Sequence, residues 1–395
     1  RMVYVVDGCR TPFMKAKNIG PFSGADLAVA AGQNLFNRQR ITADQVSEVI
    51  IGSAIPGSDE ANIARIVALR LGCGDKVPAF TVMRNCASGM QAIDSAAMNI
   101  ASGRSELVLA GGTEAMSHAP LLFNQKMVSW LSQWSSAKRM SQKFSTLMQF
   151  RASFLVPVIA LLRGLTDPIV GMNMGQTAEE LAYRFHLTRL QLDEFAVQSH
   201  QRLKKAYEDN EMDEVVPIID KQGNVYSRDD GLRHDSSVEK LGKLKPVFDK
   251  QFGLVTAGNS SQITDGACLL LLASADAVKK YKLPVIGRIV DTEWAALNPV
   301  QMGLGPVHAA TPIMERHHLK PSDFDCWEIN EAFAAQVLAC LAAWDDPDYC
   351  KTQFGLTKAL GAPDQAIVNQ QGGAIAIGHP IGASGARIVL HVLQS

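Results

Sequence analysis

The sequence predicts an α/β protein whose sheets are largely buried, and two observations carry this prediction. Short apolar segments that are rich in β-branched residues or leucine recur along the chain, at residues 3–6, 49–51, 107–110 and 268–273. Alanine-rich stretches of helical length lie between them, at residues 25–36 and 89–102 among others. Nearly continuous apolar strands that alternate with helices are typical of sheets covered on both faces.

The composition favours a chain with a large core and no dominant charge. Hydrophobic residues make up 47% of the 395 residues and charged residues 19%, which excludes global disorder. The 38 basic and 39 acidic residues give a formal net charge of −1, so no basic field points to nucleic acid. The longest apolar run, residues 154–162, contains Pro157 and is shorter than the roughly 18 residues that span a bilayer.

Seven cysteines are spread along the chain, at positions 9, 73, 86, 268, 326, 340 and 350. Their number is odd and no Cys-x-x-Cys pair occurs, which argues against a disulfide framework and against a zinc ribbon. We therefore expect reduced, mostly buried thiols and no metal site, with at most one or two of the thiols taking part in chemistry.

Residues 115–166 interrupt the alternation of strands and helices. This stretch has no Asp or Glu, and its basic and aromatic residues are Lys126, Lys138, Arg139, Lys143, Arg151, Arg163, Trp130, Trp134, Phe123, Phe144, Phe150 and Phe154. We expect a largely helical insertion that docks on an anionic membrane surface or on a partner subunit, with the aromatic residues as its apolar face. The alternative is a solvated basic loop whose aromatic side chains fill its own core.

The other segments follow more regular patterns. Residues 176–209 predict an amphipathic helical pair, and residues 217–245 predict a polar connector rich in turns. Regular alternation resumes near residue 254. Near the start of the chain, Thr42 followed by Gln45 predicts a helix N-cap.

A weak internal repeat links two distant parts of the chain. The segment Cys86-Ala-Ser-Gly opens a helix after the predicted strand 80–83, and Gly382-Ala-Ser-Gly opens another predicted helix, 386–395. The first helix is followed by a strand near residues 106–110, whereas no strand follows the second. If the fold is duplicated, we expect the native polypeptide to continue past Ser395 with at least one more strand.

Two residues beside this repeat are candidates for catalysis. Cys86 lies between a strand and a helix of small residues, where free backbone N–H groups and the helix dipole favour the nucleophilic thiolate. His379 lies in a glycine-rich turn, where it could act as a general base or as a donor to an oxyanion. The alternatives are a buried structural cysteine and a histidine that only bonds a turn carbonyl.

Two further segments contribute candidate polar residues. Asn330 follows the predicted strand 326–329 and opens a helix, so it either caps that helix or anchors a water in an active site. The loop 255–261 ends in small polar residues, the last of which is Ser261. Such a loop suits a ligand with a phosphate or amide tail, and the alternative is an ordinary turn.

Four segments occur together and in order, namely Asn85-Cys-Ala-Ser-Gly-Met-Gln, Val255-Thr-Ala-Gly-Asn-Ser-Ser with Thr264-Asp-Gly-Ala, Asn330-Glu-Ala-Phe-Ala, and Gly378-His-Pro-Ile-Gly-Ala-Ser-Gly-Ala-Arg. This combination resembles the thiolase family, the acyl-CoA:acetyl-CoA C-acyltransferases. Further matches make the resemblance extend over essentially the whole chain: Arg10-Thr-Pro-Phe, Asn62-Ile-Ala-Arg, Ala110-Gly-Gly-Thr-Glu-Ala-Met-Ser and Met174-Gly-Gln-Thr-Ala-Glu.

The resemblance implies a duplicated five-layer α/β/α/β/α thiolase fold with an inserted, mostly helical loop domain. It places the N-terminal half at residues 1–118 and 249–277, the loop domain at 119–248 and the C-terminal half at 278–395. The insertion also resembles that of the β chain of trifunctional fatty-acid-oxidation enzymes, although Asn330 stands where those chains carry histidine.

The resemblance also implies a role for each candidate residue. Cys86 matches the nucleophile that takes the acyl group as a thioester, and His379 matches the histidine that activates it and helps to build an oxyanion hole. Asn330 matches the asparagine that holds the catalytic water of that hole. Ser261 matches a serine that contacts coenzyme A, and the residues that match pocket positions near the pantetheine and acyl groups are Met174, Ala332 and Phe333. No permanently bound cofactor is implied, and coenzyme A is the co-substrate.

One feature of the family has no counterpart in this sequence. Thiolases carry a second cysteine in a Cys-x-Gly motif, on a strand after the helix that follows Gly-His-Pro, and the sequence ends at Ser395, where that strand should begin. We expect the continued polypeptide to carry this cysteine.

The leading hypothesis is a 3-ketoacyl-CoA thiolase of fatty-acid β-oxidation. A biosynthetic acetoacetyl-CoA thiolase shares every catalytic residue, and a thiolase-like subunit that binds acyl-CoA without turnover is a third hypothesis. A ketoacyl synthase is disfavoured, because that branch uses two histidines where Asn330 and His379 stand.

The resemblance also suggests what the protein contacts and where. The expected partners are acyl-CoA and CoA, a second copy in a homodimer or tetramer, a hydratase/dehydrogenase α subunit, and an anionic membrane surface contacted through residues 115–166. Nucleic acid is not expected. The expected location is the bacterial cytoplasm with peripheral membrane association, or alternatively the mitochondrial matrix.

Overall fold

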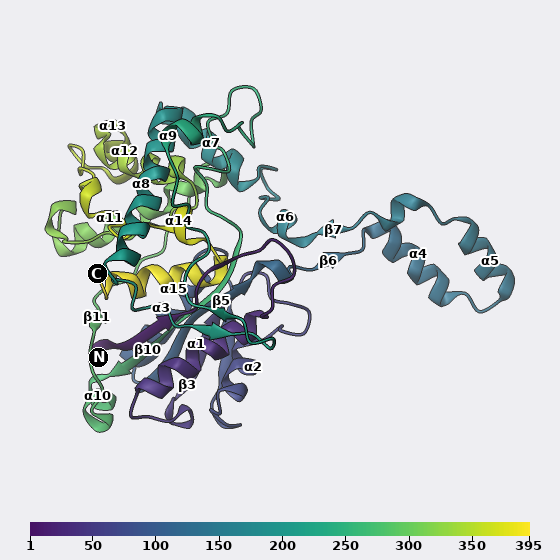
Figure 1. The fold of residues 1–395 in the computed structure, drawn as a ribbon, viewed down its shortest axis with the longest axis horizontal. Helices are drawn as coiled ribbons and strands as arrows, with labels where there is room; N and C mark the ends of the chain where they lie inside the picture. Colours follow the sequence, from purple (N-terminus) through teal and green to yellow (C-terminus); the bar gives the residue numbers. More distant parts are fainter.

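The computed structural model describes all 395 residues and is built around one seven-stranded mixed sheet (Figure 1). The strand order is β11-β1-β10-β5-β3-β4, and β2 pairs with β10. The strands are β1 (Val3–Arg10), β2 (Met14–Lys15), β3 (Glu48–Gly52), β4 (Ala79–Val82), β5 (Leu107–Ala115), β10 (Thr264–Ser274) and β11 (Gly287–Ile289). Strands β3, β4 and β5 run parallel, and β10 is antiparallel to both β5 and β1. The predicted strands 3–6, 49–51, 107–110 and 268–273 are confirmed.

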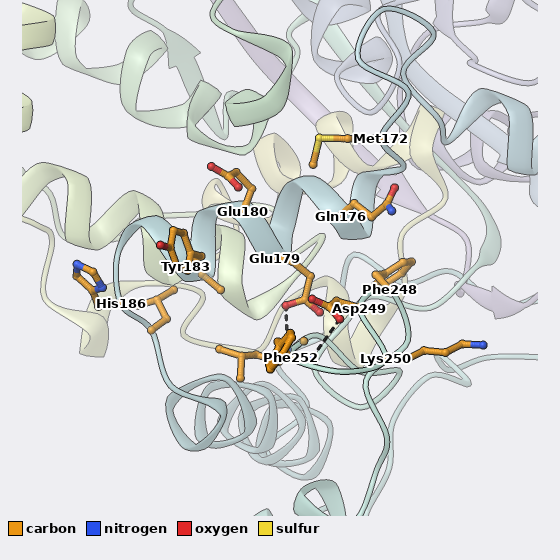
Figure 2. Close-up of a pocket in the computed structure, with 14 residues that line it drawn as sticks. Met172, Gln176, Glu179, Glu180, Tyr183, His186, Phe248, Asp249, Lys250 and Phe252 are labelled. Carbon is orange, nitrogen blue, oxygen red and sulfur yellow. Dashed lines mark hydrogen bonds between the residues drawn. The ribbon is translucent and has the colours of Figure 1, made fainter.

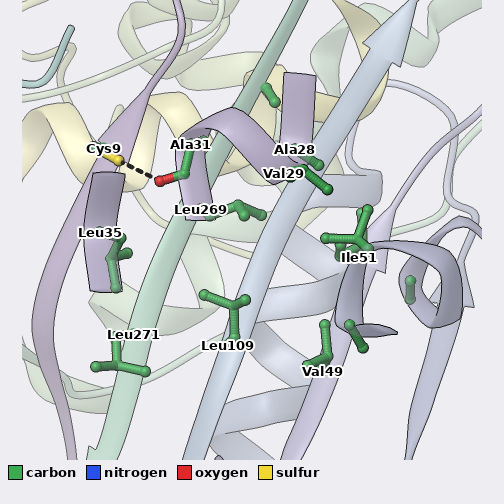
Figure 3. Close-up of a cluster of buried hydrophobic side chains, with 14 of the residues drawn as sticks. Cys9, Ala28, Val29, Ala31, Leu35, Val49, Ile51, Leu109, Leu269 and Leu271 are labelled. Atoms are coloured by element: carbon green, nitrogen blue, oxygen red, sulfur yellow. Dashed lines mark hydrogen bonds between the residues drawn. The ribbon is translucent and has the colours of Figure 1, made fainter. Parts of the chain in front are cut away.

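Helices cover both faces of this sheet, as the continuous apolar strands predicted. Leu269 and Leu271 of β10 face α1 (Gly24–Arg38) and α2 (Ile63–Arg70), in the cluster that Figure 3 shows. Leu270 and Leu272, which point to the opposite face, pack against α3 (Ser88–Ala101) and α15 (Ile381–Val392). The alternation of side chains along a strand therefore places one apolar set in each layer.

A second, helical core surrounds the fully buried Trp344. It is formed by α7 (Met174–Arg184), α8 (Arg189–Glu208), α11 (Gly305–His317), α12 (Ala334–Asp345) and α13 (Pro347–Phe354). The remaining short elements are β8 (Ile218–Ile219), β9 (Val225–Tyr226), α9 (Val238–Gly242), α10 (Ala275–Tyr281) and α14 (Ala374–Ile377). The predicted helical pair over 176–209 is confirmed as α7 and α8.

No helix is both long and apolar enough to cross a bilayer.

Two local predictions need correction. The segment 326–329 is not a full strand, because it forms only the single bridge between Trp327 and Val368 and has no second neighbour to extend the ladder. The residues after Thr42 form a single 3₁₀ turn, Ala43–Gln45, and not an α-helix. The predicted cap is nevertheless present, since the Gln45 side chain accepts a hydrogen bond from the Thr42 N–H at 3.0 Å.

The basic insertion projects from the body as a long arm (Figure 1). Its stem is the two-stranded ladder of β6 (Leu121–Leu122) and β7 (Val158–Ile159), which is followed by α6 (Ala160–Gly164). Its tip consists of α4 (Gln125–Ser136) and α5 (Met140–Met148). The prediction of a largely helical insertion outside the sheet is confirmed.

The arm's tryptophans do not supply its exposed apolar face, which corrects one part of the prediction. Trp130 stacks on Trp134 with ring centroids 5.7 Å apart and meets the edge of Phe150 at 5.2 Å. The indole N–H of Trp130 donates to the carbonyl of Thr146 at 2.7 Å, so these rings form the arm's own small core. Other apolar side chains are exposed in their place: Leu121, Leu122, Phe123, Val128, Met140, Phe144, Leu147, Met148, Leu155, Val156, Ile159 and Leu162.

The two copies of the Ala-Ser-Gly repeat lie against each other where α3 crosses α15. A Cβ atom at Gly89 would lie 2.8 Å from the carbonyl oxygen of Gly382, and one at Gly385 would lie 2.6 Å from the backbone nitrogen of Met90. A Cβ atom at Gly112 of β5 would overlap with the same Gly382 oxygen. Only glycine allows the backbones of the two helix starts and the strand to approach this closely.

We predict that Gly112→Ala destabilises the protein by about 1–3 kcal/mol, because the added methyl group meets a backbone atom that cannot rotate away. Urea unfolding followed by circular dichroism measures this loss. The control is Gly305→Ala at the start of α11, where a Cβ atom meets nothing within 4 Å and the backbone is already helical. Equal stability of the two variants would contradict the close approach.

Candidate active site

Cys86 lies in the tight turn between β4 and α3. Asn85 adopts a left-handed backbone conformation with φ of 46°, which is strained for a residue with a side chain. The Ser88 hydroxyl holds the turn, because its oxygen accepts from the Arg84 N–H at 2.8 Å and its proton goes to the Asn85 carbonyl at 2.7 Å. The turn leaves Cys86 half-buried, as Cys326 also is, whereas the other five cysteines are buried.

The electrostatic setting of Cys86 differs from the sequence-based prediction. Burial raises the pKa of the Cys86 thiol to about 11, and the nearby Glu114 carboxylate raises it further, while a backbone hydrogen bond opposes these effects only in part. The predicted stabilisation of the thiolate by the start of α3 is therefore wrong as a statement about the resting protein. At neutral pH Cys86 is a thiol, and it needs a base to become a nucleophile.

His379 lies in the turn between α14 and α15. Gly378 before it has φ of 116° and packs against Thr264, so no other residue fits this turn. A buried glutamate accepts a hydrogen bond from the first turn of each flanking helix. Glu331 accepts from the Ile375 N–H at 3.2 Å, and Glu114 accepts from the Gly382 N–H at 3.0 Å. Both ends of the turn are thus fixed.

The environment of His379 keeps its imidazole neutral. Burial lowers the pKa of His379 to about 4, and the positive charge of Arg387 lowers it further. The Nδ1 atom lies 2.6 Å from the Ser384 hydroxyl oxygen, and no backbone carbonyl contacts the ring. The alternative of a histidine that only bonds a turn carbonyl is therefore not supported. A neutral imidazole can accept a proton from a thiol.

Glu114 connects the turns that carry Cys86 and His379. Its negative charge raises the pKa of the Cys86 thiol, and its carboxylate accepts a hydrogen bond from the Gly382 N–H in the first turn of α15. It takes further hydrogen bonds from the Ala54 and Ile55 N–H groups, at 2.7 and 2.9 Å, and from the Ser53 hydroxyl at 3.0 Å. This carboxylate and the contact of Gly89 with Gly382 therefore place the turns of the two candidate residues next to one another.

Asn330 lies against His379 and does not cap a helix. Its side-chain nitrogen is 3.5 Å from both ring nitrogens, which is contact distance but too long for a good hydrogen bond. Helix α12 begins at Ala334 after Phe333, and no side chain caps it. The buried Oδ1 atom of Asn330 has no hydrogen-bond partner in the protein. A buried amide oxygen without a partner suits a bound water or a ligand donor.

The loop that ends at Ser261 pairs with the segment after Asn330. The Ser261 N–H donates to the Ala332 carbonyl at 3.0 Å, and Ser260 forms a bridge with Phe333. One residue later, the Gln262 carbonyl accepts from the His379 N–H at 3.2 Å. Ser261, Ala332 and Phe333 therefore border the site of Cys86 and His379.

Met174 reaches this group only indirectly, through a residue that the sequence did not single out. The Phe248 ring meets the edge of Phe333 with centroids 6.0 Å apart, and it packs so closely on Gly175 that a Cβ atom there would overlap with it. Met174 is the neighbour of Gly175 at the start of α7. The position of Phe248 shortly before the Val-Thr-Ala-Gly-Asn-Ser-Ser segment was the only signal for it in the sequence.

A cavity of about 710 Å³ opens beyond Phe248, between α7 and residues 248–254 (Figure 2). Glu179 of α7 fixes the far wall by accepting from the Leu254 and Val255 N–H groups at 2.8 and 2.9 Å. The lining includes Phe248 but neither Cys86 nor His379. The cavity thus adjoins the candidate site and does not contain its reactive groups. No cluster of three or more His, Cys, Asp or Glu side chains could hold a metal ion.

Comparisons with known proteins agree with this geometry. The family models described as "Thiolase, N-terminal domain" and "Thiolase, C-terminal domain" match residues 3–276 and 283–395. The chain is 35% identical to the mitochondrial trifunctional enzyme subunit beta of Homo sapiens, over 99% of this chain and 82% of that protein. It is 39% identical to the beta-ketoadipyl-CoA thiolase of Pseudomonas knackmussii, over 99% and 91% of the two chains.

A solved structure gives the same result. The human mitochondrial 3-ketoacyl-CoA thiolase in complex with CoA superposes with a TM-score of 0.84 at 34% identity, and the match covers 100% of this chain and 91% of that one. The likeness therefore extends over the whole of this chain. The chain therefore has the duplicated thiolase fold and belongs to the thiolase family of acyltransferase enzymes.

Proposed function

We propose that the protein is a 3-ketoacyl-CoA thiolase of fatty-acid β-oxidation, which cleaves 3-ketoacyl-CoA with coenzyme A into acetyl-CoA and a shortened acyl-CoA. One observation carries this proposal. The turns that carry the half-buried Cys86 thiol and the neutral His379 imidazole meet where α3 crosses α15, and the unpartnered amide oxygen of Asn330 belongs to the side chain that lies against His379. A thiol, a neutral base and a free polar atom are the groups that acyl transfer needs.

In the first half-reaction, His379 takes the proton of the Cys86 thiol as the sulfur attacks C3 of the substrate. The bond between C2 and C3 breaks, its electron pair remains on C2, and C2 gains the proton that His379 took from Cys86, which gives acetyl-CoA and a neutral imidazole. The acyl group stays on Cys86 as a thioester. In the second half-reaction, the sulfur of coenzyme A attacks this thioester as His379 takes its thiol proton. The acyl group leaves as acyl-CoA, and His379 passes the proton to the sulfur of Cys86.

The other candidate residues serve binding and charge stabilisation. The Asn330 amide oxygen holds a water that, together with protonated His379, donates to the oxyanion formed at the attacked carbonyl. Ser261 contacts coenzyme A, and Met174, Ala332 and Phe333 line the path of its pantetheine arm. The pairing of Ser261 with Ala332 supports the placement of these two residues beside His379, and the packing of Phe248 between Phe333 and Gly175 supports that of Phe333 and Met174.

The alternative functions differ in a measurable way. A biosynthetic acetoacetyl-CoA thiolase uses the same residues but acts on four-carbon substrates, so rates across acyl chain lengths separate the two. A subunit that only binds acyl-CoA would form no acyl-enzyme. The relative named trifunctional enzyme subunit beta favours the degradative direction.

We predict that Cys86→Ala abolishes both thiolysis and the acyl-enzyme, because the sulfur that carries the acyl group is gone. Thiolysis is followed by loss of absorbance of the 3-ketoacyl-CoA–Mg²⁺ complex, and the acyl-enzyme is detected by intact-protein mass spectrometry. Cys326→Ala is the matched control, because Cys326 is the other half-buried thiol and lies outside the site. An acyl adduct that persists in Cys86→Ala would refute the assignment.

We predict that alkylation of Cys86 by iodoacetamide rises about tenfold for each pH unit between pH 7 and 9, because the thiolate fraction grows tenfold per unit below a pKa of about 11. Peptide mass spectrometry on the Cys326→Ala background isolates the Cys86 adduct. A rate that levels off near pH 7 would instead indicate a resting thiolate–imidazolium pair and would contradict the neutral state of His379.

A second observation concerns the arm of residues 115–166, and we propose that it docks on an anionic membrane surface. Met140, Phe144 and Met148 recur at intervals of four residues on α5 and are 80%, 66% and 65% exposed. Side chains at this spacing share one face of a helix. Lys138 and Arg139 flank this face, and the whole arm has no acidic residue to offset its six basic ones. Apolar and basic groups together are typical of interfacial helices.

We predict that the Lys138→Glu/Arg139→Glu double variant loses binding to liposomes that contain cardiolipin, since each basic residue near such a surface contributes about 1 kcal/mol. Flotation on a density gradient measures the binding, and added salt should weaken it in the parent protein. The control, Lys279→Glu/Lys280→Glu at the end of α10, makes the same charge change outside the arm.

Two results would overturn this proposal. The first is flotation of the arm variant at the level of the parent protein. The second is an arm that binds no vesicle but retains a co-purifying hydratase/dehydrogenase subunit, which would assign the surface to a partner protein.

A further inference from the structure

Ser384 has a position that the proposed chemistry does not yet use. It lies in the first turns of α15 and is only 1% exposed. Its hydroxyl oxygen is 2.6 Å from Nδ1 of His379 and 3.0 Å from the carbonyl oxygen of Pro380. No carboxylate bonds the His379 ring, so this hydroxyl is the one side-chain group at good hydrogen-bond distance from it.

The single proton of this hydroxyl permits two arrangements. In the first, the hydroxyl donates to Nδ1, and the proton of the neutral ring sits on Nε2. In the second, the hydroxyl donates to the Pro380 carbonyl and its oxygen accepts from Nδ1–H, which leaves a lone pair on Nε2. The two arrangements make His379 respectively a donor or a base at Nε2.

The surrounding backbone favours the second arrangement. Serine in a helix commonly donates to the carbonyl four residues earlier, and Pro380 stands at that position relative to Ser384. Ser88 in the other copy of the repeat shows the same two-sided use, since it accepts from the Arg84 N–H and donates to the Asn85 carbonyl. In both copies the serine of Ala-Ser-Gly therefore lies at hydrogen-bond distance from a carbonyl of the preceding turn and from one further group.

We propose that Ser384 is a positioning residue that holds the proton of neutral His379 on Nδ1, so that Nε2 is the proton acceptor in the site. It occupies the place that a carboxylate has in a Ser-His-Asp triad. A neutral hydroxyl stabilises an imidazolium less than a carboxylate does, and the buried Arg387 disfavours that charge as well. The proton taken from Cys86 is therefore held only briefly and is returned within the reaction.

The catalytic consequence rests on the proposed thiolase function, whereas the position of the proton does not. The first measurement is therefore made on the resting protein by ¹⁵N NMR of a sample labelled at histidine, where a protonated ring nitrogen and a bare one have distinct shifts. We expect Nδ1 of His379 to be protonated at pH 7 and Nε2 to be bare. A His379→Asn variant assigns the signal.

His200 provides an internal reference of the opposite kind. It is buried, and its Nδ1 accepts from the Arg233 N–H at 3.2 Å, so its proton sits on Nε2. Burial lowers the pKa of His200 to about 4, so both rings are neutral in the same spectrum. If His379 shows the pattern of His200, the proposal is overturned, whatever the protein's activity.

The second measurement uses Ser384→Ala with Thr311→Val as the matched control. Thr311 is also a buried hydroxyl that donates to the carbonyl four residues earlier, that of Val307 at 2.7 Å, and it also accepts from an aromatic N–H, that of Trp344 at 3.1 Å. It lies on α11, outside the site. If the loss of a buried hydroxyl affects only folding, both variants should therefore lose a similar amount of stability and activity.

We predict that Ser384→Ala redistributes the His379 proton between the two ring nitrogens and lowers kcat about tenfold, the factor that one neutral hydrogen bond supports. The KM for coenzyme A should stay the same, because Ser384 does not contact the substrate. Ser384→Cys, with its weaker acceptor, should give intermediate values. An unchanged proton distribution in Ser384→Ala, or an equal loss of kcat in Thr311→Val, overturns the proposal.

The two proposals fail in distinguishable ways. If the parent protein forms no acyl-enzyme, the thiolase function is wrong, while the NMR pattern still decides the role of Ser384. If turnover is normal and the proton of His379 is on Nε2, the function stands and the assignment of Ser384 is wrong.

Discussion

The approach of two polypeptide backbones at the crossing of α3 and α15 is the constraint on which the rest of this structure depends. Gly89 and Gly385 remove the side chains that would otherwise separate the two helices, and Gly112 and Gly382 let β5 come equally close to the start of α15. Cys86 and His379 each precede one of these helices by two residues. The crossing therefore fixes the two residues relative to one another through main-chain atoms, which vary less than side-chain rotamers.

The same compactness determines the charge state of the site. Closely packed backbone excludes water, and burial without a partner of opposite charge favours the neutral form of every titratable group. This effect raises the pKa values of Cys86 and Glu114 and lowers that of His379. The candidate site is thus a neutral thiol–imidazole pair beside a hydrogen-bonded carboxyl group.

Much of this arrangement could be predicted from the sequence, because it depends on local patterns. The continuous apolar runs identified the strands, and the repeated Ala-Ser-Gly segments identified the two helix starts. The pKa of Cys86 could not be predicted, because it depends on burial and on Glu114, which lies 28 residues further along the chain. Desolvation raises this pKa by more than the backbone hydrogen bond at Cys86 lowers it.

The roles of Ser384 and Glu114 and the packing of the arm could not be predicted from the sequence either, because they depend on contacts that form only in the folded chain. Ser384 and Glu114 both lie inside segments that marked the family, but only their distances to His379 and Gly382 reveal what they hold. The aromatic residues of the arm predicted the right element, and Phe123 and Phe144 are exposed as expected, but Trp130 and Trp134 pack inside the arm. Whether Trp130 faces solvent depends on Phe150, which lies 20 residues away and folds back on it. Composition alone carries no information about that contact.

The repeat at the crossing also bears on how this chain can change over time. The first copy contains Cys86 and the second follows three residues after His379, and the serine of each copy bonds a different neighbour, so the two segments are no longer interchangeable. Their backbones nevertheless remain complementary, because a side chain added at Gly89 would meet the second copy and one added at Gly385 would meet the helix that the first copy opens. The chemistry of the halves could diverge while their shapes had to evolve together. We therefore expect sequence variation among related chains to be coupled across this contact, although some 300 residues separate its two sides.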